Sequence, residues 1–196
     1  LCVLLLVAPA AWAGQTILVF GDSLSANYGI AAEAGWVSLL QQRLDRKQYD
    51  YRIVNASISG ETTAGGASRI RAALGTHQPA IVIIELGAND GLRGLSLQAT
   101  RQNLDGIMQA CGAHKARILL IGMRLPPNYG AAYAEGFAAI YPALAKKHRA
   151  ALLPFLLDGF ADRREWFQAD NLHPTAAAQP AIMENVWAKL KPLLSK

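Results

Sequence analysis

The sequence predicts an α/β protein built on a mostly parallel, doubly wound sheet with helices on both faces. Short apolar runs alternate along the chain with longer segments whose apolar residues recur every three to four positions, a pattern typical of strands separated by helices. The apolar runs are continuous rather than interrupted by polar residues, which indicates strands buried on both faces. Because strand–helix–strand crossovers are right-handed, such a chain is expected to wind its helices onto the two faces of one sheet.

Each element of this fold can be placed in chain order. Five strands are expected, at 16–20 ("TILVF"), 51–56, 80–87, 117–123 and 151–155. The helices between them are expected at 35–47, 63–75, 97–114 and 133–149. A last helix is expected within 175–194, where Pro180 either kinks the helix or marks its true start, since proline lacks a backbone N–H. No repeat or linker interrupts the pattern, so residues 14–196 are expected to form a single domain.

The first residues have the features of a secretory signal. The stretch 1–13, "LCVLLLVAPAAWA", carries no charge and ends in a small-x-small pattern, so we interpret it as a signal remnant cleaved before Gly14. It is too short to span a bilayer, and stable membrane insertion of the mature chain is not expected. This interpretation predicts a periplasmic or secreted protein, and it leaves open whether Cys2 is a lipid-attachment site. Cys111 is then expected to be a small buried group on a helix.

Composition and charge narrow the possible functions. The chain of 196 residues is 52% hydrophobic and 17% charged, which excludes intrinsic disorder. Its formal net charge is +5, but Lys and Arg are scattered along helical segments and no stacking-aromatic motif accompanies them, so nucleic-acid binding is not predicted. The densest basic run, "KKHR" at 146–149, falls near an expected helix end, where the helix dipole favours cations. We expect a monomer that acts on a small molecule, with no cofactor and no metal.

Polar motifs follow the expected strands at one edge of the sheet. "GDSLS" follows the first strand, "SISGETT" the second, "GAND" the third and "RLPPNYG" the fourth, while "DNLHP" at 170–174 precedes the last helix. Open parallel sheets place their sites at the carboxyl ends of the strands, so motifs far apart in the sequence are expected to meet there.

Ser23 is the best candidate for a nucleophile among these groups. A serine nucleophile needs a histidine base, and that base needs an orienting partner. His173 has a carboxylate three residues earlier, Asp170, and a proline immediately after it, so a tight turn would let Asp170 hold Nδ1–H and leave Nε2 to face Ser23. The alternative for this stretch is a polar helix-capping turn. His77, His114 and His148 are instead interpreted as residues at helix ends.

Two further residues are candidates for stabilising an oxyanion. Gly60 offers a backbone N–H without a side chain in the way, and Asn89 offers a side-chain amide. The alternatives are an ordinary turn glycine and a helix N-cap or Asx-turn, respectively. Position 25 is Ser, so the G-x-S-x-G elbow of the α/β-hydrolases is not present.

Together, "FGDSLS", "NASISGETT", "GAND" and "DNLHP" resemble the four blocks of the SGNH (GDSL) hydrolases, and the similarity extends through "ELGANDGLRG", "RLPPNYG" and "YPALAK". The branch most similar includes bacterial acyl-CoA thioesterase I, protease I and lysophospholipase, also called arylesterase. The resemblance implies a flavodoxin-like three-layer α/β/α fold. It also implies a triad of Ser23, His173 and Asp170, with an oxyanion hole formed by Ser23 N–H, Gly60 N–H and the Asn89 side chain. This chain has Ala88 and Asn171-Leu172 where the branch often has Gly and Gly-Ile.

The activity that the resemblance implies is hydrolysis of carboxylic esters and thioesters through an acyl-enzyme. The alternative from another class is a non-catalytic flavodoxin-like binding module, which would leave the Asp170–His173 pairing unexplained and lacks a Gly-rich phosphate loop. The loops 91–96 and 125–133 are expected to line an acyl groove. Glu85 lies in an otherwise apolar strand, so we expect it to pair with Arg124 at the end of the next strand.

Overall fold

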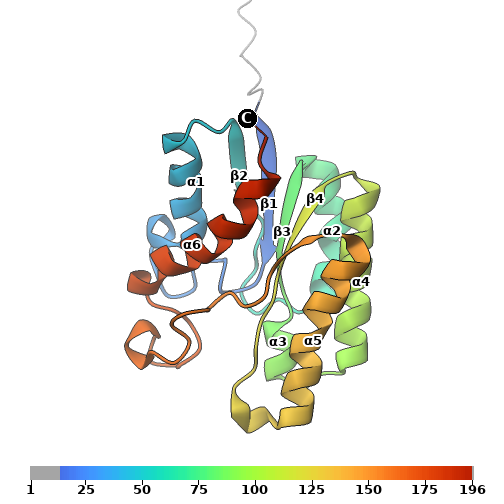
Figure 1. Ribbon diagram of the computed structural model, residues 1–196, viewed down its shortest axis with the longest axis vertical. Helices are drawn as coiled ribbons and strands as arrows, with labels where there is room; N and C mark the ends of the chain where they lie inside the picture. The colour runs from blue at the N-terminus through green and yellow to red at the C-terminus, as the bar shows by residue number, and fades with distance from the viewer. Residues whose placement is uncertain (1–13, 196) are drawn as a thin grey trace, which may run out of the picture.

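A computed structural model describes residues 14–195 and contains the five-stranded parallel sheet that the sequence predicts (Figure 1). The strands lie in the order β2-β1-β3-β4-β5, and each neighbouring pair is parallel. Their bounds are β1 Gln15–Gly21, β2 Tyr51–Asn55, β3 Ile81–Glu85, β4 Arg117–Ile121 and β5 Ala151–Leu153. The winding direction reverses between β1 and β3, which is the flavodoxin-like order and the point where such sheets bind ligands.

Helices cover both faces of this sheet in three layers (Figure 1). Helices α1 and α6 pack together on one face, and α2, α4 and α5 form the layer on the other. The helices are α1 Trp36–Arg46, α2 Thr63–His77, α3 Ala88–Leu92, α4 Leu97–Ala113, α5 Ala131–His148 and α6 Gln179–Leu190. The predicted doubly wound α/β/α fold is confirmed.

The continuous apolar runs are explained by this double cover. The whole of β3 and the last six residues of β1 are buried, because helices lie on both sides of these central strands. Cys111 is buried on α4, as predicted, and burial raises the pKa of its thiol to about 12. None of the described helices is long and apolar enough to cross a bilayer. The expected signal remnant, with Cys2, lies outside the described residues.

Two local features differ from the sequence prediction or complete it. Pro180 stands in the first turn of α6, where no intrahelical partner for its N–H is needed, so it marks the helix start rather than a kink. The "GAND" motif is not a plain loop, because it opens the short helix α3. Gly87, which precedes α3, has φ +114°, a conformation that glycine adopts without strain. Ala88 therefore stands at an ordinary helical position.

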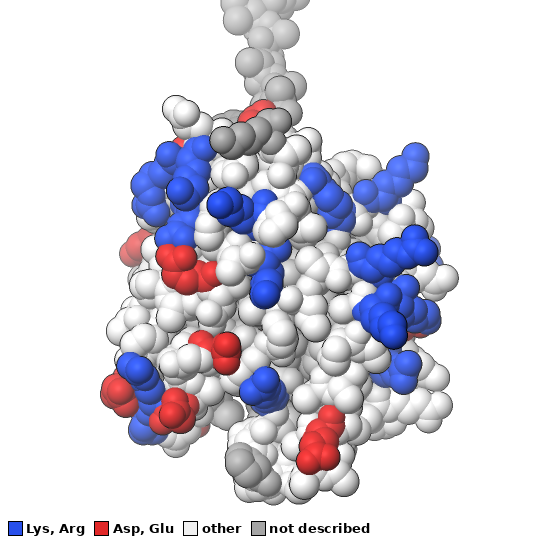
Figure 2. Space-filling view, in the orientation of Figure 1, with Lys and Arg blue, Asp and Glu red and all other residues white. Residues whose placement is uncertain are grey.

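Charged side chains occur in separate groups on the face shown in Figure 2, with Asp and Glu among the Lys and Arg. Several charged side chains of the protein are paired, as in Arg43–Glu184 between α1 and α6 and Lys147–Asp105 between α5 and α4. His148 also contacts Asp105, at 2.6 Å. This mixed distribution agrees with the interpretation of the basic residues as solvated helix faces and ends.

Candidate active site

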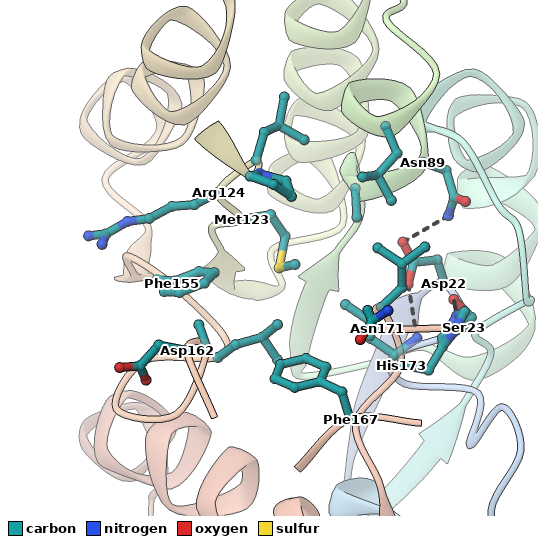
Figure 3. Close-up of a pocket in the computed structure, with 18 of the residues that line it drawn as sticks. Asp22, Ser23, Asn89, Met123, Arg124, Phe155, Asp162, Phe167, Asn171 and His173 are labelled. Atoms are coloured by element: carbon teal, nitrogen blue, oxygen red, sulfur yellow. Dashed lines mark hydrogen bonds between the residues drawn. The ribbon is translucent and has the colours of Figure 1, made fainter. Parts of the chain in front are cut away.

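The carboxyl edge of the sheet brings the candidate residues to one region of the molecule, toward the bottom of Figure 1. Ser23 lies just after β1, Asn89 lies in α3 after β3, and Asp170 and His173 come from the segment that precedes α6. Ser23, Asn89 and His173 line one pocket, and Figure 3 shows them together on one side of it.

Asp170 and His173 are held in a tight turn. His173 Nδ1 lies 2.7 Å from Asp170 Oδ2, while Asp170 Oδ1 accepts hydrogen bonds from the backbone N–H groups of Leu172 (2.9 Å) and His173 (3.0 Å). Partial burial opposes ionisation, but these three hydrogen bonds outweigh it and lower the pKa of Asp170 to about 2. The turn requires a left-handed residue at 171, and Asn171, at φ +59°, is among the non-glycine residues that adopt this conformation most readily.

The other imidazole nitrogen faces the serine. His173 Nε2 lies 2.8 Å from Ser23 Oγ, which is the distance of a direct hydrogen bond (Figure 3). The ring of Tyr28 packs over the imidazole of His173 with centroids 4.3 Å apart. Gln168 Nε2 ties the two loops together by donating to the carbonyls of Tyr28 and Pro174. The imidazole is therefore fixed from both of its nitrogens and from one face.

Asn89 reaches the site from α3, and its amide is fixed by two acceptors. Its Nδ2 donates to Asp22 Oδ2 at 3.1 Å (Figure 3). It also donates to the Glu61 carbonyl at 3.0 Å. Asp22 Oδ1 accepts from the N–H of Leu24 at 3.0 Å, which shapes the backbone turn around Ser23. Asp22 thus joins the amide of Asn89 to that turn. This role of Asp22 was not predicted, and the sequence feature that could have indicated it is the position of Asp22 directly before Ser23.

Gly60 lies in the turn after β2 with φ +79°, and it is not among the pocket-lining residues. Its carbonyl accepts from Arg93 Nη2 at 3.2 Å, so its peptide is held from the carbonyl side. Within residues 14–195, the backbone N–H groups of Ser23 and Gly60 make no hydrogen bond to another protein group. These two N–H groups can therefore donate to a ligand without breaking a hydrogen bond to the described residues, whereas the Asn89 amide has to break one.

A second, fully buried carboxyl group lies behind Ser23. Glu85 Oε2 accepts from Ser25 Oγ at 2.7 Å and from the N–H of Asp22 at 3.3 Å. Burial, and then repulsion by Asp22, raise the pKa of Glu85 well above its ordinary range. Burial also raises the pKa of Asp22, to about 6, against the lowering effects of the Leu24 N–H and the charge on His173.

The predicted Glu85–Arg124 ion pair is wrong. Arg124 is exposed and its guanidinium lies over the ring of Phe155, 5.0 Å from the centroid, and Figure 3 shows it directed away from Ser23. The register explains the error. Ile84 pairs with Leu120, so Arg124 lies beyond the strand end while Glu85 is still inside the sheet. The guanidinium of Arg124 stays in water, because pairing with the buried Glu85 would require it to lose its hydration.

The pocket beside Ser23 has a volume of about 650 Å³ and an apolar wall. Figure 3 shows it extending from Ser23 and His173 toward Met123 and Phe155. Its apolar lining includes Leu92, Met123, Leu125, Phe155, Leu157 and Phe167. Leu92 and Leu125 belong to the two loops that the sequence analysis expected at the groove. Much of the remaining wall comes from the segment 155–167, which the sequence analysis missed because it has no regular apolar period.

The remaining histidines lie elsewhere. His77 is the last residue of α2, His114 follows α4, and His148 ends α5. Over the described part of the chain, no three His, Cys, Asp or Glu side chains come together in a group that could hold a metal ion.

Known proteins are similar in sequence to this chain along nearly its whole length. The GDSL-like Lipase/Acylhydrolase family model matches residues 19–180. Esterase TesA of Pseudomonas aeruginosa is 50% identical over 98% of this chain and 96% of that protein. Thioesterase 1/protease 1/lysophospholipase L1 of Escherichia coli K12 is 45% identical over 98% of this chain and 91% of that protein.

Solved structures are similar as well. The crystal structure of TesA, at 52% identity, matches with a TM-score of 0.90 over 92% of this chain and 100% of that one. The psychrotrophic esterase EstA from Pseudoalteromonas, in a structure inhibited by monoethylphosphonate, matches at 40% identity and a TM-score of 0.87, over 91% of this chain and 97% of that one. The resemblance found in the sequence is thus confirmed, and the chain belongs to the GDSL-like lipase/acylhydrolase family.

Proposed function

We propose that this protein is a serine hydrolase that cleaves carboxylic esters and thioesters through an acyl-enzyme. In this proposal Ser23 is the nucleophile, His173 its base and Asp170 the acid that orients His173. The observation that carries the proposal is the continuous chain of hydrogen bonds from Ser23 Oγ through the imidazole to Asp170, at 2.8 and 2.7 Å, at the edge of an apolar pocket. The names of the family relatives, an esterase, an arylesterase and a thioesterase/protease/lysophospholipase, support the same chemistry.

The reaction proceeds in two halves. Ser23 Oγ attacks the acyl carbonyl carbon as its proton passes to His173 Nε2, and the tetrahedral intermediate expels an alcohol or thiol that takes this proton. Water then attacks the acyl-enzyme, again with His173 as base, and releases the carboxylic acid and Ser23. Asp170 stays ionised throughout, because its pKa is about 2, and it stabilises the imidazolium formed in each half.

The oxyanion of each intermediate is assigned to three donors: the N–H of Ser23, the N–H of Gly60 and the Nδ2 of Asn89. The first two have no protein acceptor among the described residues, and the third is oriented by Asp22 and the Glu61 carbonyl. The two backbone donors can therefore stabilise developing charge without reorganisation, whereas the Asn89 amide donates to the oxyanion by releasing Asp22 or the Glu61 carbonyl.

The pocket supports aryl and short-to-medium acyl groups as substrates. A volume of about 650 Å³ lined by Met123, Phe155, Leu157 and Phe167 suits an apolar chain extending from Ser23. Replacing Met123 with Trp would fill part of this space. We expect it to lower kcat/KM for decanoyl relative to butyryl p-nitrophenyl esters at least about tenfold, since a few buried methylenes contribute that much. Equal effects on both esters would show that the pocket does not bind the acyl chain.

The uncharged stretch 1–13 supports a proposal for the cellular location of the enzyme. We propose that residues 1–13 direct export, that cleavage precedes Gly14, and that residues 14–196 act as a single-domain monomer in the periplasm or outside the cell. The mature N-terminus, determined by mass spectrometry of protein from a periplasmic fraction, tests this; a retained leader in the cytoplasm would contradict it.

Labelling with a fluorophosphonate tests the chemistry directly. We expect stoichiometric modification at Ser23 and none in Ser23→Ala, together with loss of hydrolysis of p-nitrophenyl esters, acyl-CoAs and lysophospholipids in that variant. An unlabelled but folded wild-type protein would instead favour the alternative of a non-catalytic binding module.

A further inference from the structure

The loop at 56–61, which carries Gly60, is held at both of its ends by one side chain from α2. Arg69 Nη1 donates to the Ala56 carbonyl at 2.7 Å, and Arg69 Nε donates to Glu61 Oε2 at 2.5 Å. Glu61 is largely buried, with 11% of its side chain exposed, so this ion pair is shielded from solvent. The guanidinium therefore links the first and last residues of the loop.

The same guanidinium is anchored to the sheet. Its carbon lies 3.9 Å from the ring centroid of Phe20, on β1 three residues before Ser23. Its third nitrogen, Nη2, is buried and makes no hydrogen bond to the described residues, so the group is kept there by the ring and by its two loop contacts. A planar guanidinium can stack and donate in two directions at once, whereas a lysine ammonium cannot reproduce this geometry.

The loop that Arg69 holds contacts the site at two further points. The Glu61 carbonyl accepts from Asn89 Nδ2 at 3.0 Å, and the N–H of Ile58 donates to the carbonyl of Gly21 at 3.0 Å. A shift of this loop would therefore move the N–H of Gly60 and also release one of the two acceptors that orient Asn89. Arg69 itself does not line the pocket.

We propose that Arg69 is a positioning residue that sets the oxyanion hole by clamping the Gly60 loop between α2 and β1. The inference rests on the proposed function, because it assigns Gly60 and Asn89 to the oxyanion. Arg69 touches neither substrate nor the reacting atoms. It acts on the transition state through the loop, so its loss changes the chemical steps more than it changes substrate binding.

The test compares kcat and KM of Arg69→Met with those of the wild type, using p-nitrophenyl butyrate. Methionine keeps an apolar stem over Phe20 but removes both donors. Losing one oxyanion donor costs roughly 10²–10³ in rate, so a misaligned loop is expected to lower kcat at least about tenfold while KM stays within about threefold. Arg69→Lys keeps the charge and is expected to lower kcat in the same way, which also covers the case in which Arg69→Met does not fold.

Arg43 provides a matched control. It also pairs with a carboxylate, Glu184, and also lies over an aromatic ring, that of Trp187 at 5.6 Å, but it stands between α1 and α6. Arg43→Met is expected to keep kcat within about twofold of wild type even where it lowers Tm. A kcat for Arg69→Met and Arg69→Lys within twofold of wild type, or equal losses in the Arg43 and Arg69 variants, would overturn the proposal.

A double variant separates clamping from a stranded charge. In Arg69→Met the Glu61 carboxylate is left largely buried and unpaired, and Glu61→Gln/Arg69→Met removes that charge. If kcat stays low in the double variant, the loss comes from the missing clamp; recovery to near the wild-type value would refute the clamp. Failure of the proposed function is distinguishable from either result, because wild-type protein would then hydrolyse no ester and take up no fluorophosphonate.

Discussion

Replacing Asp22 with Asn should make the unfolding free energy of the protein less dependent on pH. Burial raises the pKa of Asp22 from its ordinary 3.8 to about 6. The folded state therefore holds this proton more tightly than the unfolded state does, so the stabilisation is fully present below pH 3.8 and is lost as the pH rises through about 6. At about 1.4 kcal/mol for each pKa unit, the full loss is about 3 kcal/mol, of which about 2 kcal/mol falls between pH 4 and pH 8.

Urea unfolding at pH 4 and pH 8 measures this effect. The difference in unfolding free energy between Asp22→Asn and wild type should shift by about 2 kcal/mol in favour of the variant from the lower to the higher pH. Taking this difference cancels groups that titrate alike in both proteins, such as Asp170. Repeating the comparison in a Glu85→Gln background removes the titration of Glu85, which faces Asp22. A difference that stays constant with pH would show that Asp22 has an ordinary pKa. The conclusion that burial raises the pKa of Asp22 beside Glu85 would then be wrong.

Three further predictions concern separate residues. Asn89→Ala should lower kcat for p-nitrophenyl esters roughly 10²–10³-fold with little change in Tm, because it removes one oxyanion donor; near-wild-type turnover would exclude Asn89 from that role. Asp170→Asn should lower kcat about 10⁴-fold, because the backbone N–H groups of Leu172 and His173 keep the amide oxygen, so the amide NH2 faces Nδ1 of His173 and favours the wrong tautomer. Steady-state kinetics, with active sites titrated by a fluorophosphonate, check this, and a loss below tenfold would contradict it. Cys111 should react with a thiol reagent at pH 8 only after unfolding, because burial raises its pKa to about 12; rapid reaction of the native protein would contradict its burial.

Much of the fold was predictable because the spacing of apolar residues in the sequence differs between strands and helices. The central strands are continuous apolar runs, since helices cover both faces, and each predicted strand overlaps an observed one. The short helix α3 was missed because five residues are too few to show a helical period, and it begins after Gly87, whose positive φ has no sequence signature beyond glycine itself.

Some residues of the candidate site could be predicted from the sequence, and others could not. Ser23, Asp170 and His173 could be grouped because strand ends converge and because Asp170 and His173 are close in the chain. Side-chain contacts between residues far apart in the sequence could not be predicted from strand ends or from closeness in the chain. Glu85 was expected to need a charge partner, but it instead accepts a hydrogen bond from Ser25 while burial raises its pKa, and the sequence does not reveal which outcome a fold adopts.

The two carboxylates near His173 complement each other. Asp170 contacts Nδ1 and remains ionised down to a pH of about 2, so its charge is present wherever the protein would work. Asp22 is buried and becomes charged only above about pH 6, and the positive charge on His173 lowers its pKa. The acid that orients the Asn89 amide thus carries its own negative charge only above about pH 6, whereas the charge of Asp170 is present at lower pH as well.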